Sequence, residues 1–210
     1  MNTRAFNPTG DREIAGVLLA GGQSNRFGDG DKCLQELDGK TLLERAALNA
    51  APQVGSLMLN INGDPDRFPE MGLPIISDNI PGHAGPLAGV LSAMECVVNH
   101  APQARWIATF ATDTPFLPPN WVARVRAAIT REGAEMGTVS SNGQMHPVIG
   151  VWPVEMRYEL RKAMLDQGVR KVDAWTGQFK VAKVDFETEG KDPFFNINTA
   201  DDLSQAASLI

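Results

Sequence analysis

Residues 14–28 read IAGVLLAGGQSNRFG, and the pair Asp31-Lys32 follows after two more residues. The first six residues form a short continuous apolar run, which is typical of a β-strand buried on both faces of a sheet. The stretch from Gly21 to Asp31 is rich in Gly, Asp and Arg, and this composition predicts a loop. Glycine lets backbone N–H groups approach an anion closely, and Arg26 and Lys32 add positive charge. A strand followed by such a loop predicts an α/β sheet with a polyphosphate cradle after its first strand.

The spacing of these glycines excludes two common phosphate-binding motifs. A Walker A loop needs G-x-x-x-x-G-K-[ST], and a dinucleotide fingerprint needs G-x-G-x-x-G. Neither pattern occurs in this loop, so the chain is neither an ordinary P-loop NTPase nor a typical NAD enzyme. The alternative is a glycine-rich surface turn with solvated charges. The strand–loop–helix context is the check that separates the two interpretations.

The rest of the chain alternates between strand-like and helix-like segments. Apolar strand candidates lie at 14–19, 57–60, 73–76, 106–111, 137–141, 147–152 and 181–186. Helical spacing and capping patterns predict helices at 41–50, 86–99, 154–165 and 169–175, a helix that Asn120 caps, and a final helix from Thr199. Strands that alternate with helices imply βαβ units. We therefore predict an α/β fold, a three-layer α/β/α sandwich around a mostly parallel, Rossmann-like sheet.

Composition places the chain among globular proteins. It has 210 residues, of which 43% are hydrophobic and 21% charged. A chain of this length buries enough surface for a stable core, which excludes disorder as its main state. We expect a flexible leader over residues 1–13 and a single domain over residues 14–210. Cys33 and Cys96 are far apart and lack a CxxC pattern, so we expect no disulfide framework, no zinc site and a reducing cytoplasm as the compartment.

Net charge and hydropathy restrict the expected partners. The chain carries a net charge of −6, whereas affinity for nucleic acid comes largely from Lys and Arg that neutralise phosphates. No apolar run approaches the roughly 20 residues that span a bilayer, and the first dozen residues lack the apolar core of a signal peptide. We therefore expect neither nucleic acid nor membrane as a partner. A local basic site for a small phosphorylated ligand is compatible with this balance.

Five segments together resemble one family. Residues 19–32 resemble the nucleotidyltransferase signature L-A-G-G-x-S-x-R-M-G-x-x-D-K, with Phe27 in place of the usual Met. The others are LMLNIN at 57–62, GPLAG at 85–89, TDTPFLPP at 112–119 and FNINT at 195–199. From Ile14 to Leu209 the chain thus resembles the molybdenum cofactor guanylyltransferases, the MobA family. His146-Pro147 resembles a further HPT-like segment of that family, in which Val148 stands here for Thr.

The resemblance implies an enzyme that uses Mg²⁺ to transfer GMP from GTP to molybdenum-loaded molybdopterin, with release of pyrophosphate. It implies contacts with GTP or its metal from Leu19, Ala20, Gly21, Lys32, Asn60, Asp78 and Asp113. Gly22 and Gly85 join this nucleotide-binding set, because a second glycine leaves room for a purine and Gly85 precedes a helix whose amino end can face an anion or a base. Molybdoenzymes and other proteins of molybdenum cofactor biosynthesis are the implied protein partners.

The chemistry of nucleotidyl transfer assigns roles to three charged residues. A phosphate oxygen attacks the α-phosphorus of an NTP, so the protein has to position two anions and neutralise the charge that grows on the leaving group. Asp113 follows a buried strand, and Mg²⁺ typically takes one or two carboxylates plus phosphate oxygens, so Asp113 is the expected metal ligand. Arg26 and Lys32 are expected to hold the β- and γ-phosphates. The alternative for Asp113 is an Asx-type turn before Pro115.

Further polar residues are candidates for recognising the two substrates. A carboxylate can accept both N1–H and the amino group of guanine, so we expect Asp78, with Asn60, to bind the base or the ribose. Ordinary strand-end turn chemistry is the alternative for both. Asn196 and Asn198 alternate along an extended segment, so both can face the site. The expected contacts with molybdopterin, which carries a terminal phosphate, are His146, Arg170, Lys171, Asn196 and Asn198.

Two other functions stay open at the level of sequence. One is a cytidylyltransferase for molybdopterin, or a nucleotidyltransferase for another small phosphate. Cytidylyl relatives read L-A-A-G in the first loop, whereas this chain reads LAGG at 19–22, which favours guanine. The other is a non-catalytic nucleotide-binding module that delivers the cofactor to a molybdoenzyme. Asp113 separates these classes, since a module that only binds needs no metal carboxylate opposite Arg26 and Lys32.

Overall fold

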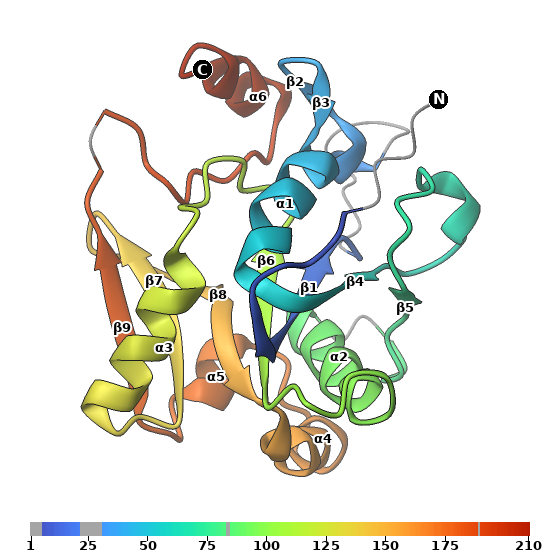
Figure 1. Ribbon diagram of the computed structural model, residues 1–210, viewed down its shortest axis with the longest axis vertical. Coiled ribbons are helices and arrows are strands. Elements are labelled where there is room, and N and C mark those ends of the chain that lie inside the picture. The colour runs from blue at the N-terminus through green and yellow to red at the C-terminus, as the bar shows by residue number, and fades with distance from the viewer. Residues whose placement is uncertain (1–5, 22–30, 83–84, 189) are drawn as a thin grey trace.

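A seven-stranded sheet forms the centre of the molecule (Figure 1). The computed structural model describes residues 6–21, 31–82, 85–188 and 190–210. The strands follow the order β5-β4-β1-β6-β8-β7-β9 across the sheet. Their bounds are β1 Asp11–Leu19, β4 Val54–Asn60, β5 Ile75–Ile76, β6 Trp106–Ala111, β7 Met136–Ser141, β8 Gln144–Pro153 and β9 Val181–Phe186. Neighbouring strands are parallel except at β8, which runs antiparallel to β6 and β7, so the predicted mostly parallel sheet is confirmed.

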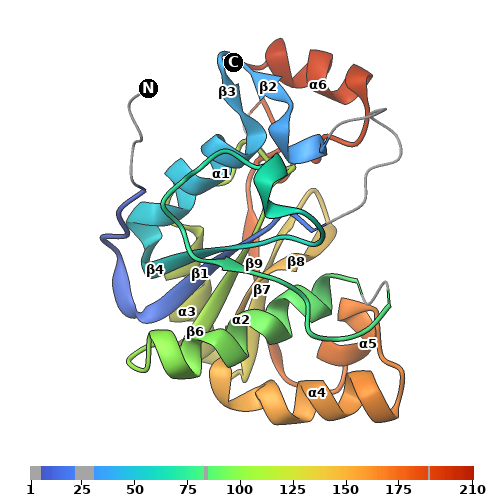
Figure 2. The ribbon, with the colours of Figure 1, turned by 90° about the vertical axis from the view of Figure 1, so that its right-hand side faces the viewer.

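Helices cover both faces of the sheet (Figure 2). One face carries α1 (Leu42–Ala50) and α3 (Trp121–Glu132). The other face carries α2 (Pro86–His100), α4 (Arg157–Asp166) and α5 (Val172–Thr176). A capping box begins α1 as expected, because the Thr41 hydroxyl accepts from Glu44 N at 3.1 Å and the Glu44 carboxylate accepts from Thr41 N at 2.8 Å. The predicted three-layer sandwich is confirmed.

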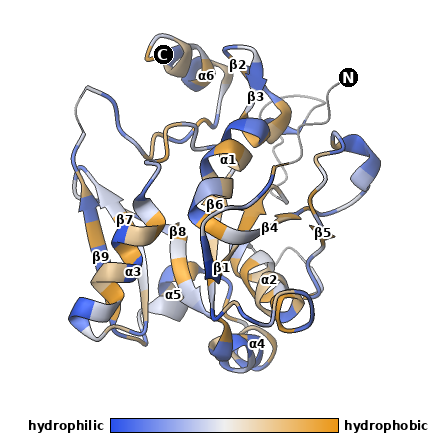
Figure 3. Ribbon diagram, viewed as in Figure 1, coloured by the Kyte–Doolittle hydropathy of each residue, from blue (hydrophilic) through white to orange (hydrophobic). Residues whose placement is uncertain are grey.

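Strand β1 shows why an uninterrupted apolar run builds two cores. Ile14 and Leu18 pack into the cluster under α1 and α3, whereas Ala15 and Val17 pack into the cluster under α2, α4 and α5. Successive side chains point to opposite faces, so a central strand with two covered faces needs apolar residues at every position. In the edge strand β9, hydrophobic and hydrophilic residues alternate from Ala182 to Phe186 (Figure 3), because the face toward α3 is the more buried one.

Strand β8 leaves its partner β6 partway along the pair. The two strands pair from Trp106 opposite Pro153 to Ala108 opposite Val151. At the next position the buried hydroxyl of Thr109 accepts from Gly150 N at 3.1 Å and from Trp152 Nε1 at 3.0 Å, and it donates to the carbonyl of Val148. One hydroxyl therefore replaces the backbone ladder where the strands diverge.

A third, small cluster lies at the carboxyl edge of the sheet. It joins the hairpin of β2 (Glu36–Leu37) and β3 (Lys40–Thr41) to α6 (Ala200–Ala207), which lie side by side in Figures 1 and 2. Its buried members are Leu37, Leu42, Ile197 and Ala206. This hairpin was not predicted, because its strands are too short to show alternation. The Asp38-Gly39 turn, with φ of 51° and 70°, is the signal that would have indicated it.

The first strand begins earlier than the apolar run. Its first three residues, from Asp11 to Glu13, are exposed and polar, so they carry no hydrophobic signal. Upstream of them, Thr9 N donates to the carbonyl of Ala51 at 3.0 Å and Gly10 N donates to that of Val54 at 2.9 Å. Strand β1 therefore begins three residues before the predicted start at Ile14.

Two predicted helix boundaries also move. The helix predicted over 154–165 begins with a 3₁₀ turn, η4 (Val154–Met156), before α4. Gly168, with φ of 68°, turns the chain after α4, so the helix predicted over 169–175 begins only at Val172.

Asn120 precedes α3, but its side chain makes no capping hydrogen bond, which corrects the prediction that Asn120 caps this helix. Within the described ranges, no helix is both long and apolar enough to cross a membrane.

Candidate functional site

Lys32, Asp113, Asn196 and Asn198 meet in one polar cluster, called here the edge cluster. Lys32 Nζ lies 2.6 Å from Asp113 Oδ2. It also donates to Asn198 Oδ1 at 2.8 Å and to Asn196 Oδ1 at 3.4 Å. The side chains of Lys32 and Asp113 are 16% and 22% exposed, so water screens this ion pair only partly. One cation is thus surrounded by three oxygen atoms from segments that are far apart in the sequence.

The parallel sheet places Asp113 at this edge. Strand β6 ends at Ala111, which lies opposite Leu19 at the end of β1. The Thr112 hydroxyl donates to the carbonyl of Leu19 at 3.1 Å and ties the loop after β6 to the end of β1. Lys32 begins the 3₁₀ turn η1 (Lys32–Leu34), which follows the first loop. The predicted position of Asp113 beyond the end of a buried strand is therefore found.

The segment around Ile197 delivers the two amides. Ile197 N donates to the carbonyl of Asp113 at 2.9 Å, and the Ile197 side chain is fully buried. Side chains alternate along an extended segment, so the neighbours of a buried Ile197 both turn toward Lys32, as their spacing predicted. Downstream, Asp202 Oδ2 accepts from Asn198 N at 2.8 Å and caps α6. This bond, together with the Thr199 hydroxyl, holds the pKa of Asp202 below its ordinary value.

Asp78 forms a second polar cluster with Asn60 and Asn62. Asn60 Nδ2 donates to Asp78 Oδ1 at 2.9 Å, and Asn62 Nδ2 donates to Asp78 Oδ2 at 2.8 Å. Asn62 Oδ1 accepts from Asp78 N at 3.2 Å. An ionised carboxylate has about four acceptor positions, so both oxygens are oriented by the protein and still have lone pairs for a ligand. Asn62 was not predicted as a site residue, although its spacing of two from Asn60 indicates a shared face.

The first loop and the amino end of α2 approach this second cluster. Ala20 N donates to the carbonyl of Asn60 at 2.9 Å. A Cβ atom on Gly21 would lie only 2.7 Å from Asn62 Nδ2, so a larger residue at this position would displace the Asn62 amide. Gly85 precedes α2 with φ of 71°, a left-handed conformation that favours glycine. Those predicted nucleotide-binding residues that the structure describes therefore converge on one edge of the sheet.

Arg67 connects the two clusters and was not predicted. It belongs to the 3₁₀ turn η3 (Pro65–Arg67), and its Nη1 lies 3.4 Å from Asp31 Oδ2, next to Lys32. Its Nη2 donates to the carbonyl of Asn62 at 3.3 Å. A lone Arg in a polar loop gives no sequence signal of such a link.

Cys33 lies directly after Lys32 and takes no part in the polar contacts. Its side chain is buried, and burial together with the nearby Asp31 carboxylate raises its pKa to about 12. A thiol with this pKa stays protonated at neutral pH and is not a nucleophile. The chemistry of the edge therefore rests on the cation, carboxylate and amide groups.

Two residues predicted to contact the pterin have partners in the protein itself. His146 Nε2 lies 2.8 Å from Ser141 Oγ. Arg170 Nη1 donates to the carbonyls of Met164 at 2.7 Å and Val169 at 2.9 Å. Arg170 thus satisfies carbonyl groups at the end of α4, a usual role for a basic residue near a helix C-terminus. These contacts place neither side chain in the edge cluster.

Three predicted residues remain, and the structure describes one of them, Lys171. Lys171 is exposed at the residue before α5. A Cβ atom on Gly85 would lie 3.2 Å from the carbonyl oxygen of Arg170, so the chain just before Lys171 runs against the amino end of α2. The predictions for Gly22 and Arg26 lie outside the described residues.

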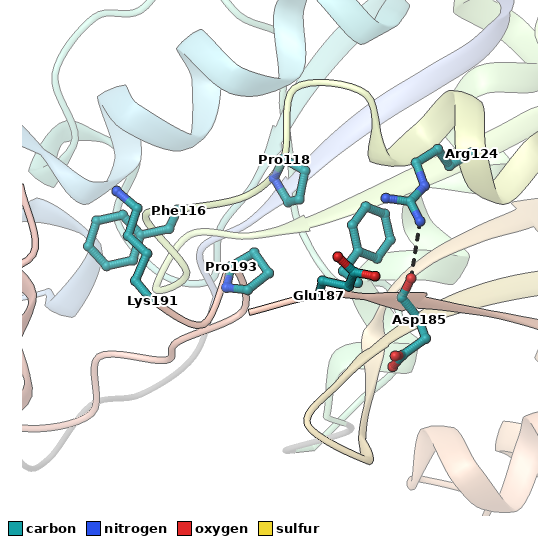
Figure 4. Close-up of a pocket in the computed structure, with 8 residues that line it drawn as sticks. Phe116, Pro118, Arg124, Asp185, Glu187, Lys191 and Pro193 are labelled. Atoms are coloured by element: carbon teal, nitrogen blue, oxygen red, sulfur yellow. Dashed lines mark hydrogen bonds between the residues drawn. The ribbon is translucent and has the colours of Figure 1, made fainter. Parts of the chain in front are cut away.

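A cavity of about 740 Å³ borders the segments that carry Asp113 and Asn196 (Figure 4). Arg124 donates to the carbonyl of Asp185 at 3.1 Å, as the dashed line marks. The residues that line the cavity are Phe116, Pro118, Arg124, Asp185, Phe186, Glu187, Lys191 and Pro193. None of the predicted site residues lines it, so the cavity is a neighbour of the candidate site rather than part of it.

The edge cluster suits a divalent cation that is shared with phosphates. In the part of the chain that the structure describes, no group of three or more His, Cys, Asp and Glu could hold a metal ion. Asp113 supplies one carboxylate, whereas the amide oxygens of Asn196 and Asn198 beside it contact Lys32. Mg²⁺ is usually bound through one or two carboxylates, waters and substrate phosphates rather than by an all-protein cage. The donor set therefore fits a cation that arrives with its substrate.

Fold and site together define the class of protein. Open α/β sheets bind ligands beyond the carboxyl ends of their strands, where both clusters lie. A family model described as the MobA-like NTP transferase domain matches residues 16–180, and the protein is a nucleotidyltransferase.

Curated relatives narrow this class. The molybdenum cofactor guanylyltransferase of Bradyrhizobium sp. (strain ORS 278) is 45% identical over 196 residues, which cover 93% of this chain and 92% of that protein. The one from Mesorhizobium japonicum is 42% identical over 202 residues, or 95% of this chain and 97% of that protein. The chain belongs to the molybdenum cofactor guanylyltransferase family. A crystal structure of molybdopterin-guanine dinucleotide biosynthesis protein A from Archaeoglobus fulgidus shares the fold, with a TM-score of 0.71 at 23% identity over 93% of this chain and 97% of that one.

Proposed function

We propose that this protein transfers GMP from GTP to molybdopterin, forms the guanine dinucleotide form of the cofactor and releases pyrophosphate. The observation that carries the proposal is the edge cluster, in which a cation, a carboxylate and two amides meet at 2.6 to 3.4 Å. Family membership supports the same reaction, because the curated relatives are guanylyltransferases over nearly their whole length.

Lys32 and Asp113 are proposed to act on the phosphates. Asp113 would hold Mg²⁺ together with phosphate oxygens, and the metal would supply charge neutralisation at the reacting phosphates. Lys32 would then bind the β- and γ-phosphates and stabilise the charge of the leaving pyrophosphate. Lys32 and Asp113 form an ion pair at 2.6 Å, so each side chain neutralises the charge of the other. Arg26 is proposed to add positive charge from the first loop.

Asp78 is proposed to recognise the nucleoside, with Asn60. Two amide donors fix its carboxylate, one on each oxygen. The remaining lone pairs suit a ligand that offers two N–H groups side by side, as guanine does. Leu19, Ala20, Gly21, Gly22 and Gly85 are proposed to line the same nucleotide site.

Molybdopterin is proposed to approach the edge cluster from the side of Asn196 and Asn198. Their amides have donor groups that the contacts with Lys32 leave free, because only the Oδ1 atoms are engaged there. Exposed Lys171 is proposed to attract the terminal phosphate, whereas His146 and Arg170 have protein partners and are weaker candidates. We further propose that residues 14–210 work as one domain in the cytoplasm, and that molybdoenzymes or other cofactor-biosynthesis proteins receive the product.

A calorimetric titration with GTP, CTP, UTP and ATP, each with Mg²⁺, tests the nucleotide assignment. We expect heat of binding with GTP and a much weaker response with the other three. A response to CTP alone would contradict the guanylyl assignment and favour the cytidylyltransferase alternative. Lys32→Ala is expected to weaken GTP binding, and unchanged affinity would remove Lys32 from the site.

Asp113→Ala separates an enzyme from a binding module. We expect the variant to fold and to lose transfer of GMP to molybdopterin, because the metal loses its carboxylate. Glu159→Ala, which removes an exposed acidic residue from α4, is the matched control and should retain turnover. Turnover at the wild-type rate in Asp113→Ala would contradict the proposed mechanism.

A further inference from the structure

The segment that carries Asn196 and Asn198 is anchored at its start by Asp192. We propose that Asp192 is a positioning residue of the transfer reaction, which holds residues 192–198 so that both amide oxygens stay on Lys32. The proposal rests on the role of Lys32 in the proposed function. It assigns a task to a carboxylate that lies outside the edge cluster itself.

The Asp192 carboxylate joins this segment to the hairpin of β7 and β8. Its Oδ1 accepts from Ser141 Oγ at 2.7 Å and from Phe194 N at 2.9 Å. Its Oδ2 accepts from Asn142 Nδ2, in the hairpin turn, at 3.4 Å. Ser141 is the last residue of β7 and is fully buried, so the carboxylate is tied to the rigid sheet. Hydrogen bonds to a charged group are roughly twice as strong as those between neutral groups.

His146 and Phe194 support the same anchor from the side. The Ser141 hydroxyl donates to Asp192, so it can accept from His146 Nε2, which lies 2.8 Å away. Burial lowers the pKa of His146, which favours the neutral imidazole. The ring of His146 packs against that of Phe194, with the centroids 4.9 Å apart, and Phe194 is only 2% exposed. This explains why a residue expected to contact the pterin points into the protein.

Buried residues connect Asp192 to the part of the segment that contacts Lys32. Phe194 is buried, and Ile197 is buried and hydrogen-bonded to the carbonyl of Asp113. When Asp113 holds a metal ion, its negative charge is shared with that ion. The amide oxygens of Asn196 and Asn198 are neutral, so they orient the ammonium group without cancelling the charge that it offers to phosphates.

The neighbouring strand position offers a matched control. Ser140 Oγ donates to Asp185 Oδ1 at 2.7 Å, the same distance as between Ser141 and Asp192. Asp185 belongs to β9 and not to the segment that carries the amides. Loss of either carboxylate removes a serine–aspartate bond at the same end of the sheet, but only one loss frees the amides.

The experiment compares full-length variants in GMP transfer and in Mg²⁺–GTP titration. Asp192→Ala is expected to lower kcat/KM for GTP about tenfold or more, because Lys32 loses oriented acceptors. Asp192→Asn keeps an oxygen for Ser141 and Phe194 and should restore most of the rate. Asp185→Ala should stay within about twofold of wild type. In a chain that already carries Asn196→Ala and Asn198→Ala, Asp192→Ala should cause no further loss, since coupled residues are not additive.

Equal losses in Asp192→Ala and Asp185→Ala, or full additivity with the two asparagine substitutions, would overturn the proposal and leave the proposed function intact. Unchanged GTP binding in Lys32→Ala would instead refute the proposed role of Lys32, and this inference with it. If Asp192→Ala does not fold, Ser141→Ala against Ser140→Ala makes the same comparison. Ser141→Ala should lose activity, though less than is expected for Asp192→Ala, and Ser140→Ala should keep it. Equal activity of those two variants would also overturn the proposal.

Discussion

Replacing Gly89 by alanine should have two opposite effects. Alanine raises helix propensity, but its Cβ atom would crowd Asn60 in the polar cluster around Asp78. Gly89 lies within α2, where alanine is favoured over glycine by about 0.8–1.0 kcal/mol. The new Cβ would lie 2.5 Å from Asn60 Oδ1 and 2.7 Å from Leu19 Cδ2, closer than real contacts allow. Asn60 is only 3% exposed and Leu19 ends a central strand, so neither can move away freely.

The two effects can be compared in size. Overpacking of a close-packed site costs about 1–3 kcal/mol. After the gain in helix propensity, the free energy of unfolding should fall by about 0–2 kcal/mol. Binding should suffer more, because a displaced Asn60 loses its hydrogen bond to Asp78 Oδ1, now 2.9 Å long. A hydrogen bond to a charged group contributes about 1.5–3 kcal/mol, so GTP affinity should fall by about 10-fold to 100-fold.

Urea unfolding and calorimetric titration with Mg²⁺–GTP measure the two quantities separately. Gly137→Ala is the matched control, because its Cβ would lie 2.6 Å from Val125 Cγ1, on the side of the sheet that α3 covers. It should cost similar stability and leave GTP affinity unchanged. If Gly89→Ala binds GTP as tightly as the wild type does, then the orientation of Asn60 does not matter to the nucleotide, and this reasoning is refuted.

Three further outcomes are expected. Thr109→Val leaves Gly150 N and Trp152 Nε1 without their buried acceptor, which should lower the free energy of unfolding by about 2–5 kcal/mol in urea, whereas Thr109→Ser should keep most of it. Burial lowers the pKa of His146 below its ordinary value, so the unfolded chain binds more protons between the two pKa values. Stability should therefore fall as the pH drops below about 6.5 and level off below the folded pKa, and His146→Gln should remove that decrease. Mass spectrometry after brief iodoacetamide treatment should find Cys96 modified and buried Cys33 intact in the native protein, and equal labelling of both thiols would contradict the burial of Cys33.

Much of the fold was predictable because burial leaves a local signal. The apolar run of β1 requires cover on both faces, and that requirement alone indicates an α/β sandwich. Asp113 was predictable for a related reason, since a polar residue just after a buried strand stands at the sheet edge. Asn196 and Asn198 were predictable from their alternation.

Contacts between distant segments were not predictable. Periodicity predicts on which face of a helix or strand a residue lies, but not which distant residue it contacts. Asn62 donates a hydrogen bond to Asp78, 16 positions away in the sequence, and Arg67 forms an ion pair with Asp31. The protein contacts of His146 and Arg170 were hidden for the same reason, because each satisfies a polar group of the protein that the sequence does not reveal. The first residues of β1 were missed because exposed polar residues in a strand look like a loop.

The edge cluster joins segments that leave the ribosome at very different times. Lys32 and Asn198 are 166 positions apart, and chains are synthesised from the amino terminus. A nascent chain that has left the ribosome as far as β9 holds every strand of the sheet, and Lys32 and Asp113, but neither amide oxygen. A chain clipped after Phe186 is in the same state. The edge cluster is thus completed in the last stage of translation, after the sheet that supports it.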